Sequence, residues 1–299
     1  MTTLPVPASF SARYLVMDCD DTFTVSGSLS PPVLQAISNA AAAGLEIILN
    51  TGRPAGYGAT LLGYVDGFTA AVMENGGAFI DALVPSPAGT VQTVPAHHRH
   101  ELPLQLLCSP SGTDSPAELR RRLTQLQERV AQKLGLKLTP TADNAYRVTD
   151  FTVLRTLTAP GASAAQSASA SLLETIKEAI QAESAGQGSL LASSIHLHFM
   201  LDGGAPRGKW QGVVELLRRR GISDPESVLA TSAVSVGDSA NDASLFVPGR
   251  FALSVGVANI ARYLPELGPA RPRHITHASE GHGLVELLDA LLKYHRPTA

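Results

Sequence analysis

The chain has 299 residues, of which 44% are hydrophobic and 16% are charged, and its formal net charge is −3. This composition predicts a globular protein with a sizeable core, built as one large domain or two smaller ones. The mildly acidic balance gives no support for nucleic-acid binding, which requires a basic face. No apolar stretch reaches the ~18 residues of a membrane-spanning helix. We therefore expect neither a nucleic-acid partner nor a membrane partner.

The cysteine content and the first residues predict a cytoplasmic location. Cys19 and Cys108 are too few for a disulfide framework and suit a reducing compartment, although the two could bridge. Residues 1–5 have neither the basic region nor the long apolar region of a signal peptide. Small soluble molecules are therefore the expected partners, and the sequence makes no prediction of the oligomeric state.

The first third of the chain alternates between strand and helix patterns. The apolar run at 14–17 predicts a buried strand, and Ser30 and Pro31 are typical of a helix start, with Gly44 after its end. Further strands are expected at 45–49, 69–73 and 78–80, and a further helix at 55–62. This alternation predicts a parallel sheet with right-handed crossovers.

The middle of the chain, from about 84 to 199, is richer in Pro, Ser and Thr. It contains two helix patterns, at 116–134 and 170–183, and strand-like runs at 105–107, 146–148, 151–154 and 195–199. The alternation of strand and helix patterns then resumes, with helices at 209–220 and 283–294 and strands at 232–236, 251–255 and 274–276. We predict the α/β class: a Rossmann-like, doubly wound parallel sheet core formed by residues 1–84 and 200–299, with an α+β cap domain at 85–199 inserted in it.

Three carboxylates, on Asp18, Asp20 and Asp21, directly follow the first predicted strand. Open α/β sheets bind their ligands at the carboxyl ends of the strands. Crowded carboxylates repel each other and raise each other's pKa. A divalent cation such as Mg²⁺ would relieve this repulsion. The alternative is an acidic turn that simply faces solvent.

Other polar residues at predicted strand ends and helix starts favour the first interpretation. Thr51 follows the second strand, Asp238, Asn241 and Asp242 follow a later one, and Lys209 begins a helix. In phosphoryl transfer, one carboxylate can attack phosphorus while a second serves as general acid and base. A hydroxyl and an ammonium can hold the phosphoryl oxygens.

Four segments in this order resemble the motifs of the haloacid dehalogenase (HAD) superfamily phosphatases. They are Asp18-x-Asp20-x-Thr22, Thr51-Gly52-Arg53, Lys209, and Gly237-Asp238-Ser239-x-Asn241-Asp242. The insert lies between the second and third motifs, as in the type IIB cap subgroup, which includes Cof-type, sucrose-phosphate and mannosyl-3-phosphoglycerate phosphatases. Residues 74–77 and 257–259 are similar to secondary signatures of that subgroup.

The resemblance implies a role for each acid of the first motif. Asp18 matches the nucleophile that forms an aspartyl-phosphate and also binds Mg²⁺. Asp20 matches the general acid and base, and its backbone carbonyl matches a second Mg²⁺ ligand. Asp21 stands where glycine is commonest in the family, and we expect its side chain to face solvent, cap a turn or contact water near the site.

The resemblance also assigns the later motifs. Thr51, with Gly52 and Arg53, matches the phosphate-binding segment, and Lys209 matches the lysine that holds the nucleophile and phosphate together. Asp238 matches a Mg²⁺ ligand, and Asp242 matches an acid bound to the metal or to its waters. Asn241 is expected to contact phosphate or its neighbours.

Two histidines lie in the predicted cap. His196 and His198 alternate along a strand and therefore share one face of it. They are interpreted as ordinary sheet residues or residues of the inner cap face, as substrate contacts, or as a transition-metal pair. His198 is the candidate for substrate binding.

The sequence therefore predicts a Mg²⁺-dependent phosphatase that hydrolyses a small phosphorylated metabolite, a sugar phosphate or a phosphoglycerate-type ester, bound between core and mobile cap. A phosphomutase of the same fold and a non-catalytic phosphate-binding protein remain alternatives. A response-regulator receiver is disfavoured because the strand that should carry its phosphoacceptor aspartate ends in Thr51.

Overall fold

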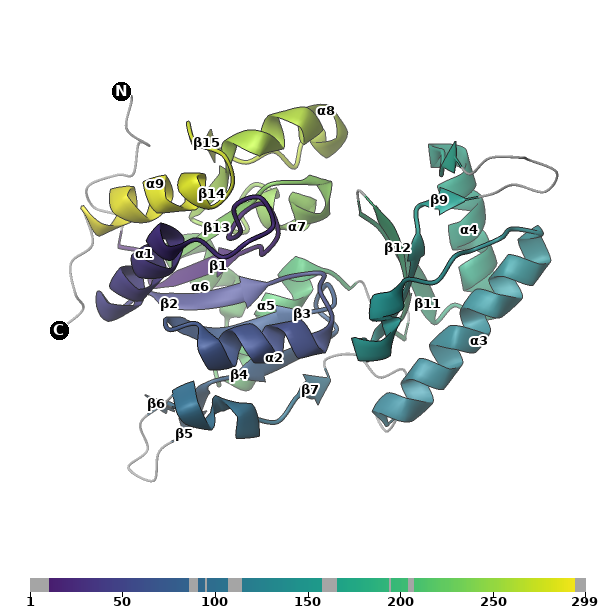
Figure 1. Ribbon diagram of the computed structural model, residues 1–299, viewed down its shortest axis with the longest axis horizontal. Coiled ribbons are helices and arrows are strands. Elements are labelled where there is room, and N and C mark those ends of the chain that lie inside the picture. Colours follow the sequence, from purple (N-terminus) through teal and green to yellow (C-terminus); the bar gives the residue numbers. More distant parts are fainter. Residues whose placement is uncertain are drawn as a thin grey trace. The chain divides into compact units, whose positions relative to one another are not determined.

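The computed structural model describes residues 11–85, 91–94, 96–106, 115–157, 166–193, 195–203 and 207–293. These residues form two compact units. Unit 1 holds the residues up to Arg53, Tyr57–Gln105 and those from Gly208 onward, and unit 2 holds Pro54–Gly56 and Leu106–Arg207. Unit 2 is thus inserted into the chain of unit 1 (Figure 1). Among these residues, no helix combines the length and the apolar character that a membrane span requires.

Unit 1 is built on an eight-stranded, mostly parallel sheet with the order β15-β14-β13-β1-β2-β3-β4-β7. Its strands are β1 (Tyr14–Met17), β2 (Glu46–Asn50), β3 (Phe68–Met73), β4 (Ala78–Asp81), β7 (Gln105–Leu106), β13 (Ala233–Gly237), β14 (Leu253–Gly256) and β15 (His274–Ile275). Every residue of β1 is buried, and β1 pairs in parallel with β13 on one side and β2 on the other. The turn at 74–77 joins β3 and β4 into an antiparallel hairpin, as its Asn-Gly pair predicts.

Helices cover both faces of this sheet, which confirms the predicted doubly wound core (Figure 1). They are α1 (Pro31–Ala42), α2 (Ala55–Tyr64), α5 (Lys209–Arg219), α6 (Pro225–Ser232), α7 (Ala243–Phe246), α8 (Leu264–Leu267) and α9 (Glu280–Leu292), with short 3₁₀ helices η1 (Ala96–Glu101), η3 (Ala240–Asp242) and η4 (Ala258–Tyr263). The apolar side chains of α1 recur at helical spacing and are buried, and α1 packs on α9. Helix α5 packs against β3 and β4.

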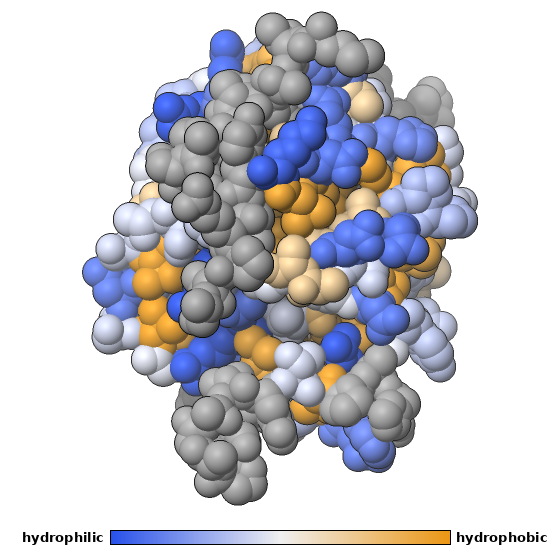
Figure 2. Space-filling model, turned by 90° about the vertical axis from the view of Figure 1, so that its left-hand side faces the viewer, coloured by the Kyte–Doolittle hydropathy of each residue, from blue (hydrophilic) through white to orange (hydrophobic). Residues whose placement is uncertain are grey.

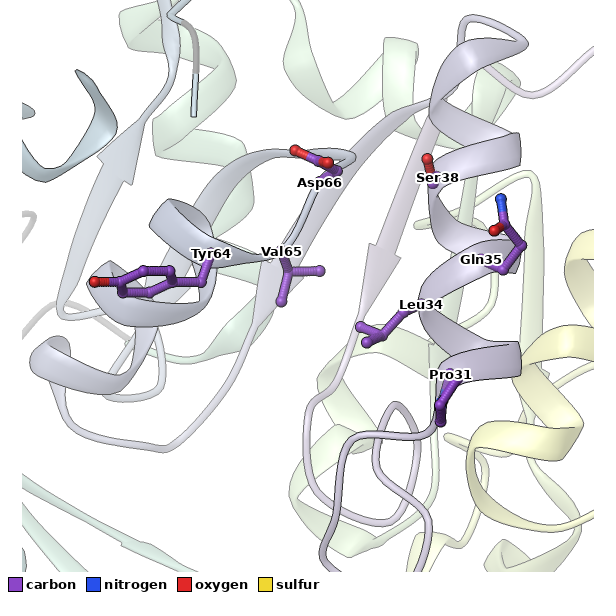
Figure 3. Close-up of a pocket in the computed structure, with 7 residues that line it drawn as sticks. All are labelled: Pro31, Leu34, Gln35, Ser38, Tyr64, Val65 and Asp66. Carbon is purple, nitrogen blue, oxygen red and sulfur yellow. The ribbon is translucent and has the colours of Figure 1, made fainter. Parts of the chain in front are cut away.

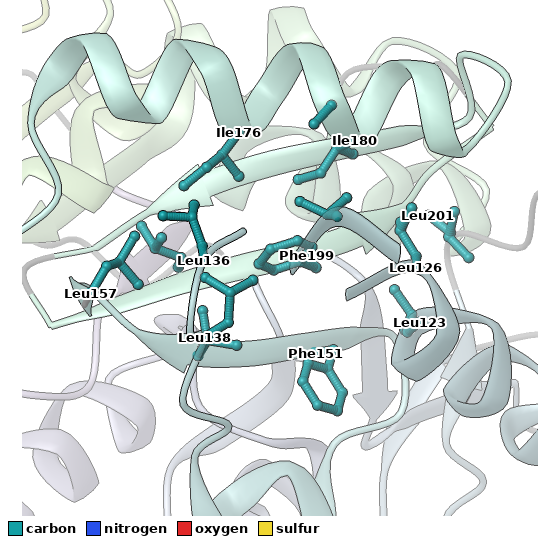
Figure 4. Packing of buried hydrophobic residues seen from close by; sticks show 14 of the residues in the cluster. Leu123, Leu126, Leu136, Leu138, Phe151, Leu157, Ile176, Ile180, Phe199 and Leu201 are labelled. Atoms are coloured by element: carbon teal, nitrogen blue, oxygen red, sulfur yellow. The ribbon is translucent and has the colours of Figure 1, made fainter. Parts of the chain in front are cut away.

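Unit 2 is an α+β layer with a core of its own. Its antiparallel sheet has the order β11-β12-β8. Its elements are α3 (Pro116–Leu134), η2 (Ala142–Tyr146), β8 (Asp150–Leu154), β9 (Thr156–Leu157), β10 (Gln166–Ser167), α4 (Ala170–Glu183), β11 (Gly188–Ala192) and β12 (His196–Leu201). The alternate residues Leu197, Phe199 and Leu201 of β12 join the cluster that packs this sheet against α3 and α4 (Figure 4). His198 therefore lies on the opposite face.

The described contacts divide the chain at different points from the predicted 84/85 and 199/200. The hairpin of β5 (Leu83–Pro85) and β6 (Val91–Thr93), followed by β7 at the sheet edge, keeps the described part of 85–105 in unit 1. At the other end, β12 continues to Leu201, which pairs with Gly188 of β11 and so stays in unit 2.

One expected strand of unit 2, at 146–148, is wrong. Tyr146 ends η2, and Arg147 and Val148 lie in no strand. The side chain of Arg147 is paired with Asp143, 2.7 Å away, and with Asp150, 3.0 Å away. These short-range ion pairs favour a turn, and the apolar pattern of three residues did not reveal them.

Candidate active site

Three neighbouring parallel strands deliver polar residues to one edge of the sheet of unit 1. Met17, the last residue of β1, lies beside Leu49 of β2 and Val236 of β13. The strands therefore end together, and Asp18, Thr51 and Asp238 follow them within one or two residues. The backbone N–H of Asp18 donates to the carbonyl of Val236 at 3.0 Å, so the turn after β1 starts in register with β13.

Lys209, the first residue of α5, is buried and reaches two of the predicted acids. Its Nζ donates to Oδ1 of Asp18 and to Oδ1 of Asp242, both at 2.6 Å. Asn50, at the end of β2, donates from Nδ2 to the carbonyl of Lys209 at 2.9 Å and so anchors the helix start. Sequence reasoning missed Asn50. Its signal was an amide closing an otherwise apolar strand, directly before Thr51.

The start of α5 also approaches the 74–77 turn closely. Gly76 has a φ of +85°, and a Cβ built there would lie 2.3 Å from the carbonyl oxygen of Gly208. A Cβ on Gly212, one turn into α5, would lie 2.6 Å from the Cα of Gly76. Because both positions lack side chains, the helix that carries Lys209 can rest directly on this turn.

Asp18, Asp238 and Asp242 form a buried cluster whose ligand atoms lie within 4.8 Å of one another. Oδ2 of Asp242 accepts hydrogen bonds from the backbone N–H groups of Asp238 and Ser239, at 3.0 and 3.1 Å. Three carboxylates carry more negative charge than the ammonium of Lys209 neutralises. Their hard oxygen donors fit a divalent ion such as Mg²⁺.

The pKa values describe the same excess of negative charge. Burial, and then the charge of Asp242, raise the pKa of Asp18 to about 7 despite Lys209. Burial, Asp242 and Asp18 raise the pKa of Asp238 to about 9. Burial alone would lower the pKa of Lys209, but Asp18 and Asp242 outweigh it and hold that pKa above its usual value. A cation bound among these acids would stabilise their charged forms.

The side chain of Asp20 lies outside this cluster. Its two carboxylate oxygens accept from Nε and Nη2 of Arg53, both at 2.7 Å, a bidentate pair that is nearly half exposed. Oγ1 of the buried Thr51 accepts from the backbone N–H of Arg53 at 3.1 Å. The sequence predicted Arg53 as a phosphate-binding residue and did not reveal its pairing with Asp20.

No protein-family model and no curated protein matches the chain. Solved structures do match. A haloacid dehalogenase-like hydrolase from Bacteroides thetaiotaomicron is 14% identical, with a TM-score of 0.57 over 93% of this chain and 99% of its own. A HAD subclass IIB sugar phosphatase is 14% identical, with a TM-score of 0.55 over 93% of this chain and 98% of its own.

A third match is the sucrose-phosphatase from Synechocystis in complex with sucrose and phosphate. It is 16% identical, with a TM-score of 0.57 over 94% of this chain and 98% of its own. The chain has the HAD-like hydrolase fold. Because the matches span nearly the whole chain, the likeness includes the inserted unit as well as the sheet of unit 1.

Within this HAD-like fold, the last motif forms η3 and the turn before it. Asn241 is half-buried there, and its Oδ1 accepts from the hydroxyl of Ser239 at 2.7 Å. Asp21 lies in the turn after β1 with a φ of 53°, a left-handed conformation that favours glycine and that aspartate tolerates. This conformation explains why glycine is common at that position in the family that the sequence resembles.

His198 lies in unit 2, in a buried group of charged residues. Its Nδ1 is 2.7 Å from Oδ2 of Asp150, which also pairs with Arg147. Burial alone would raise the pKa of Asp150, but Arg147 and His198 outweigh it and hold that pKa well below its usual range. Within unit 2, His198 is thus a partner of Asp150.

Cys19 lends no support to a redox role. Cys19 is a free, buried thiol, and Cys108 lies outside the described residues. Burial, and then the charges of Asp20 and Asp18, raise the pKa of the Cys19 thiol far above its usual value, so it stays protonated.

The surface of unit 1 also has a hollow of about 340 Å³ that is separate from these residues (Figure 3). It lies between α1 and the end of α2 and is lined by Pro31, Leu34, Gln35, Ser38, Tyr64, Val65 and Asp66. None of these is a candidate site residue. On the face viewed in Figure 2, hydrophobic patches are interrupted by hydrophilic side chains.

Proposed function

We propose that the chain is a Mg²⁺-dependent phosphatase that hydrolyses a small phosphorylated metabolite through an aspartyl-phosphate intermediate. One observation carries the proposal: the buried ammonium of Lys209 joins Asp18 to Asp242 at 2.6 Å each, at the carboxyl ends of the central strands of a HAD-like fold. A nucleophile, a fixed positive charge and further acids are thus gathered where α/β sheets act on their ligands.

In this proposal, a carboxylate oxygen of Asp18 attacks phosphorus. A bond forms between that oxygen and phosphorus as the bond to the ester oxygen breaks. Lys209 and the hydroxyl of Thr51 hold the phosphoryl oxygens, on which negative charge must be stabilised. Fixing these groups in advance accounts for most of the rate, because the phosphoryl transition state needs positioning and charge more than covalent help.

Asp20 is proposed to move the protons. It gives a proton to the leaving ester oxygen and then takes one from the water that attacks the phosphorus of the aspartyl-phosphate. This second step releases phosphate and restores Asp18. The bidentate contact from Arg53, at 2.7 Å for both hydrogen bonds, would orient the Asp20 carboxyl group.

Asp18 and Asp238 are the proposed side-chain ligands of Mg²⁺, with the backbone carbonyl of Asp20. Asp242 would act on the metal or its waters while Lys209 and two backbone N–H groups hold its carboxylate. When bound, the ion supplies positive charge to the phosphoryl group.

The substrate class is proposed from the similar structures. They include a sugar phosphatase and a sucrose-phosphatase that holds sucrose and phosphate. We therefore propose a sugar phosphate as substrate, and the resemblance of residues 74–77 to a type IIB signature adds a phosphoglycerate-type ester as a second candidate. A cytoplasmic location is proposed from the low cysteine content. Asn241, Gly52 and Arg53 are proposed near the phosphate, and His198 remains a proposed substrate contact.

A phosphate-release screen tests this function. Purified full-length protein would be incubated with p-nitrophenyl phosphate and a panel of sugar phosphates and phosphoglycerates, with Mg²⁺ or with EDTA. We expect Mg²⁺-dependent turnover that Asp18→Asn abolishes without unfolding the protein. Conversion of one sugar phosphate into its isomer would favour a phosphomutase. Binding of phosphate esters without any turnover would refute the proposal in favour of a non-catalytic protein.

A further inference from the structure

Arg262 and Asp21 lie at one edge of the carboxylate cluster, and the proposed mechanism gives neither of them a role. Nη2 of Arg262 is 3.6 Å from Oδ2 of Asp21 and 3.7 Å from Oδ2 of Asp238. One nitrogen is thus shared between a surface acid and a proposed metal ligand. Both distances exceed those of a hydrogen bond, and the Arg262 side chain is 56% exposed. The guanidinium is therefore held by charge and can be displaced.

Asn259 fixes Asp21 next to Asp238. Its Nδ2 donates to the backbone carbonyl of Asp21 at 3.0 Å and to Oδ2 of Asp238 at 3.1 Å. Its Oδ1 accepts from the backbone N–H of Glu280, the first residue of α9, at 2.9 Å. One amide thereby joins the turn after β1, the end of β13 and the start of α9. Asp21 is positioned by this contact rather than placed at random on the surface.

The guanidinium of Arg262 is also positioned, by a contact with the neighbouring residue in the chain. It lies over the ring of the adjacent Tyr263, 4.9 Å from the ring centroid, in a cation–π arrangement. Arg262 and Tyr263 belong to η4 (Ala258–Tyr263), which also contains Asn259. The short helix therefore sets both the amide that orients Asp238 and the cation that faces it.

We propose that Arg262 and Asp21 form a charge pair that sets the affinity of the site for its divalent cation. The inference rests on the proposed metal site and concerns residues outside its ligand set. Arg262 competes with the ion for Oδ2 of Asp238 and lowers its affinity. Asp21 adds negative charge at the same edge, which attracts the ion, and offers the guanidinium a second carboxylate when the ion is bound. Both are positioning residues that act through Asp238.

Each substitution has an expected sign. Arg262→Gln removes the competing cation, so the Kd for Mg²⁺ should fall about two- to fivefold, the range for exposed charge pairs. Asp21→Asn should raise the Kd by a similar factor. Arg262→Lys keeps the charge and should bind Mg²⁺ nearly as the natural protein does. The double variant should depart from additivity, because the two groups face each other. All effects should shrink as salt screens exposed charges.

The experiment is calorimetric titration of MgCl₂ into the full-length protein at low and high salt, which needs no substrate. Arg271→Gln is the control, because it removes the same charge from an exposed arginine that forms no ion pair with any described residue. A Kd that falls with Arg262→Gln, rises with Asp21→Asn and is unchanged in the control supports the inference. Unchanged or weaker binding in Arg262→Gln overturns it while leaving the metal site intact. If the natural protein binds no Mg²⁺, the proposed metal site and this inference both fail.

Discussion

Nζ of Lys209 lies 2.6 Å from Oδ1 of Asp18, although 191 positions separate the two residues in the chain. The whole of unit 2 is inserted between them. They meet because β1 lies at the centre of the sheet and α5 packs beside it on β3 and β4. The contact does not depend on unit 2, because both residues belong to unit 1.

Replacing Lys209 should affect both rate and stability. Lys209→Met removes the charge that faces Asp18 and Asp242, so kcat should fall by about 10²–10³-fold or more, as for other fixed groups that stabilise developing charge. It also leaves two buried carboxylates without their cation, which should lower the free energy of unfolding by about 3–5 kcal/mol. Phosphate release and thermal unfolding measure the two effects.

Lys137→Met is a suitable control, because it makes the same change at an exposed lysine of unit 2. The control should keep natural turnover and stability. Natural kcat in Lys209→Met would contradict the role assigned to this residue.

Arg53→Lys tests whether Arg53 orients the proton donor. Lysine keeps the charge but cannot make the bidentate contact to Asp20. The variant should lose activity towards sugar phosphates, whose leaving oxygen needs a proton, and lose much less towards p-nitrophenyl phosphate, whose leaving group does not. The measured quantity is the ratio of the two kcat values. An equal loss on both substrates would assign Arg53 to phosphate binding instead.

Gly76→Ala tests the close contact beneath Lys209. The new Cβ would lie 2.3 Å from the carbonyl oxygen of Gly208, at a φ of +85° that alanine rarely adopts. Either the turn or the start of α5 must move, so we expect a loss of stability of about 1–3 kcal/mol and a lower kcat. Circular dichroism during heating and phosphate release provide the readouts.

Gly63→Ala is the matched control, because Gly63 lies within α2 and a Cβ there meets no atom within 4 Å. Alanine favours a helix over glycine, so this variant should be neutral or slightly more stable. Similar behaviour of the two variants would show that the contact at Gly76 has no special effect.

We expect the loss of stability caused by Asp150→Asn to depend on pH. The pKa of Asp150 is held below its unfolded value of about 4, so its charge stabilises the folded state above that pH, and this stability is lost as the pH falls through the folded pKa. At pH 7 the variant should be about 3–5 kcal/mol less stable, because Arg147 loses a buried partner. The difference from the natural protein should narrow below about pH 4.

Urea unfolding at a series of pH values measures this difference. The control Asp289→Asn, at an exposed position of α9, should have almost the same free energy of unfolding as the natural protein at every pH. A deficit of Asp150→Asn that is independent of pH would mean that Asp150 acts through packing and not through its charge.

The sequence reveals those parts of the fold that depend on regular patterns. The run at 14–17 is a strand with the predicted bounds, and the helices predicted at 116–134 and 170–183 have the predicted ends. For α3 the reason is local: Oγ of Ser115 accepts from the N–H of Glu118, and Gly135 closes the helix with a φ of 63°. Such capping signals lie within a few consecutive residues, so they can be recognised in the sequence alone.

The sequence could not reveal contacts between distant side chains. Asn259 follows β14 in the segment 257–259 that resembles a secondary signature of the type IIB subgroup, but that resemblance did not reveal its contacts with Asp21 and Asp238, which lie 238 and 21 positions away in the chain. The sequence likewise did not reveal the hydrogen bond from Asn50 to the carbonyl of Lys209 or the one from Arg53 to Asp20. The order of the strands in the sheet determines which of these side chains meet. The alternation of strands and helices along the sequence does not fix that order.

The central claim is that Asp18 becomes phosphorylated, and one measurement tests it directly. Asp20→Asn lacks the group that activates water, but p-nitrophenyl phosphate needs no proton to leave. This variant should release a burst of about one p-nitrophenol per active site, and mass spectrometry of the acid-quenched protein should find one phosphoryl group on Asp18. The double variant Asp18→Asn/Asp20→Asn is the control and should show neither. Turnover without a burst and without phosphorylated Asp18, or a phosphoryl group on another residue, would contradict the account.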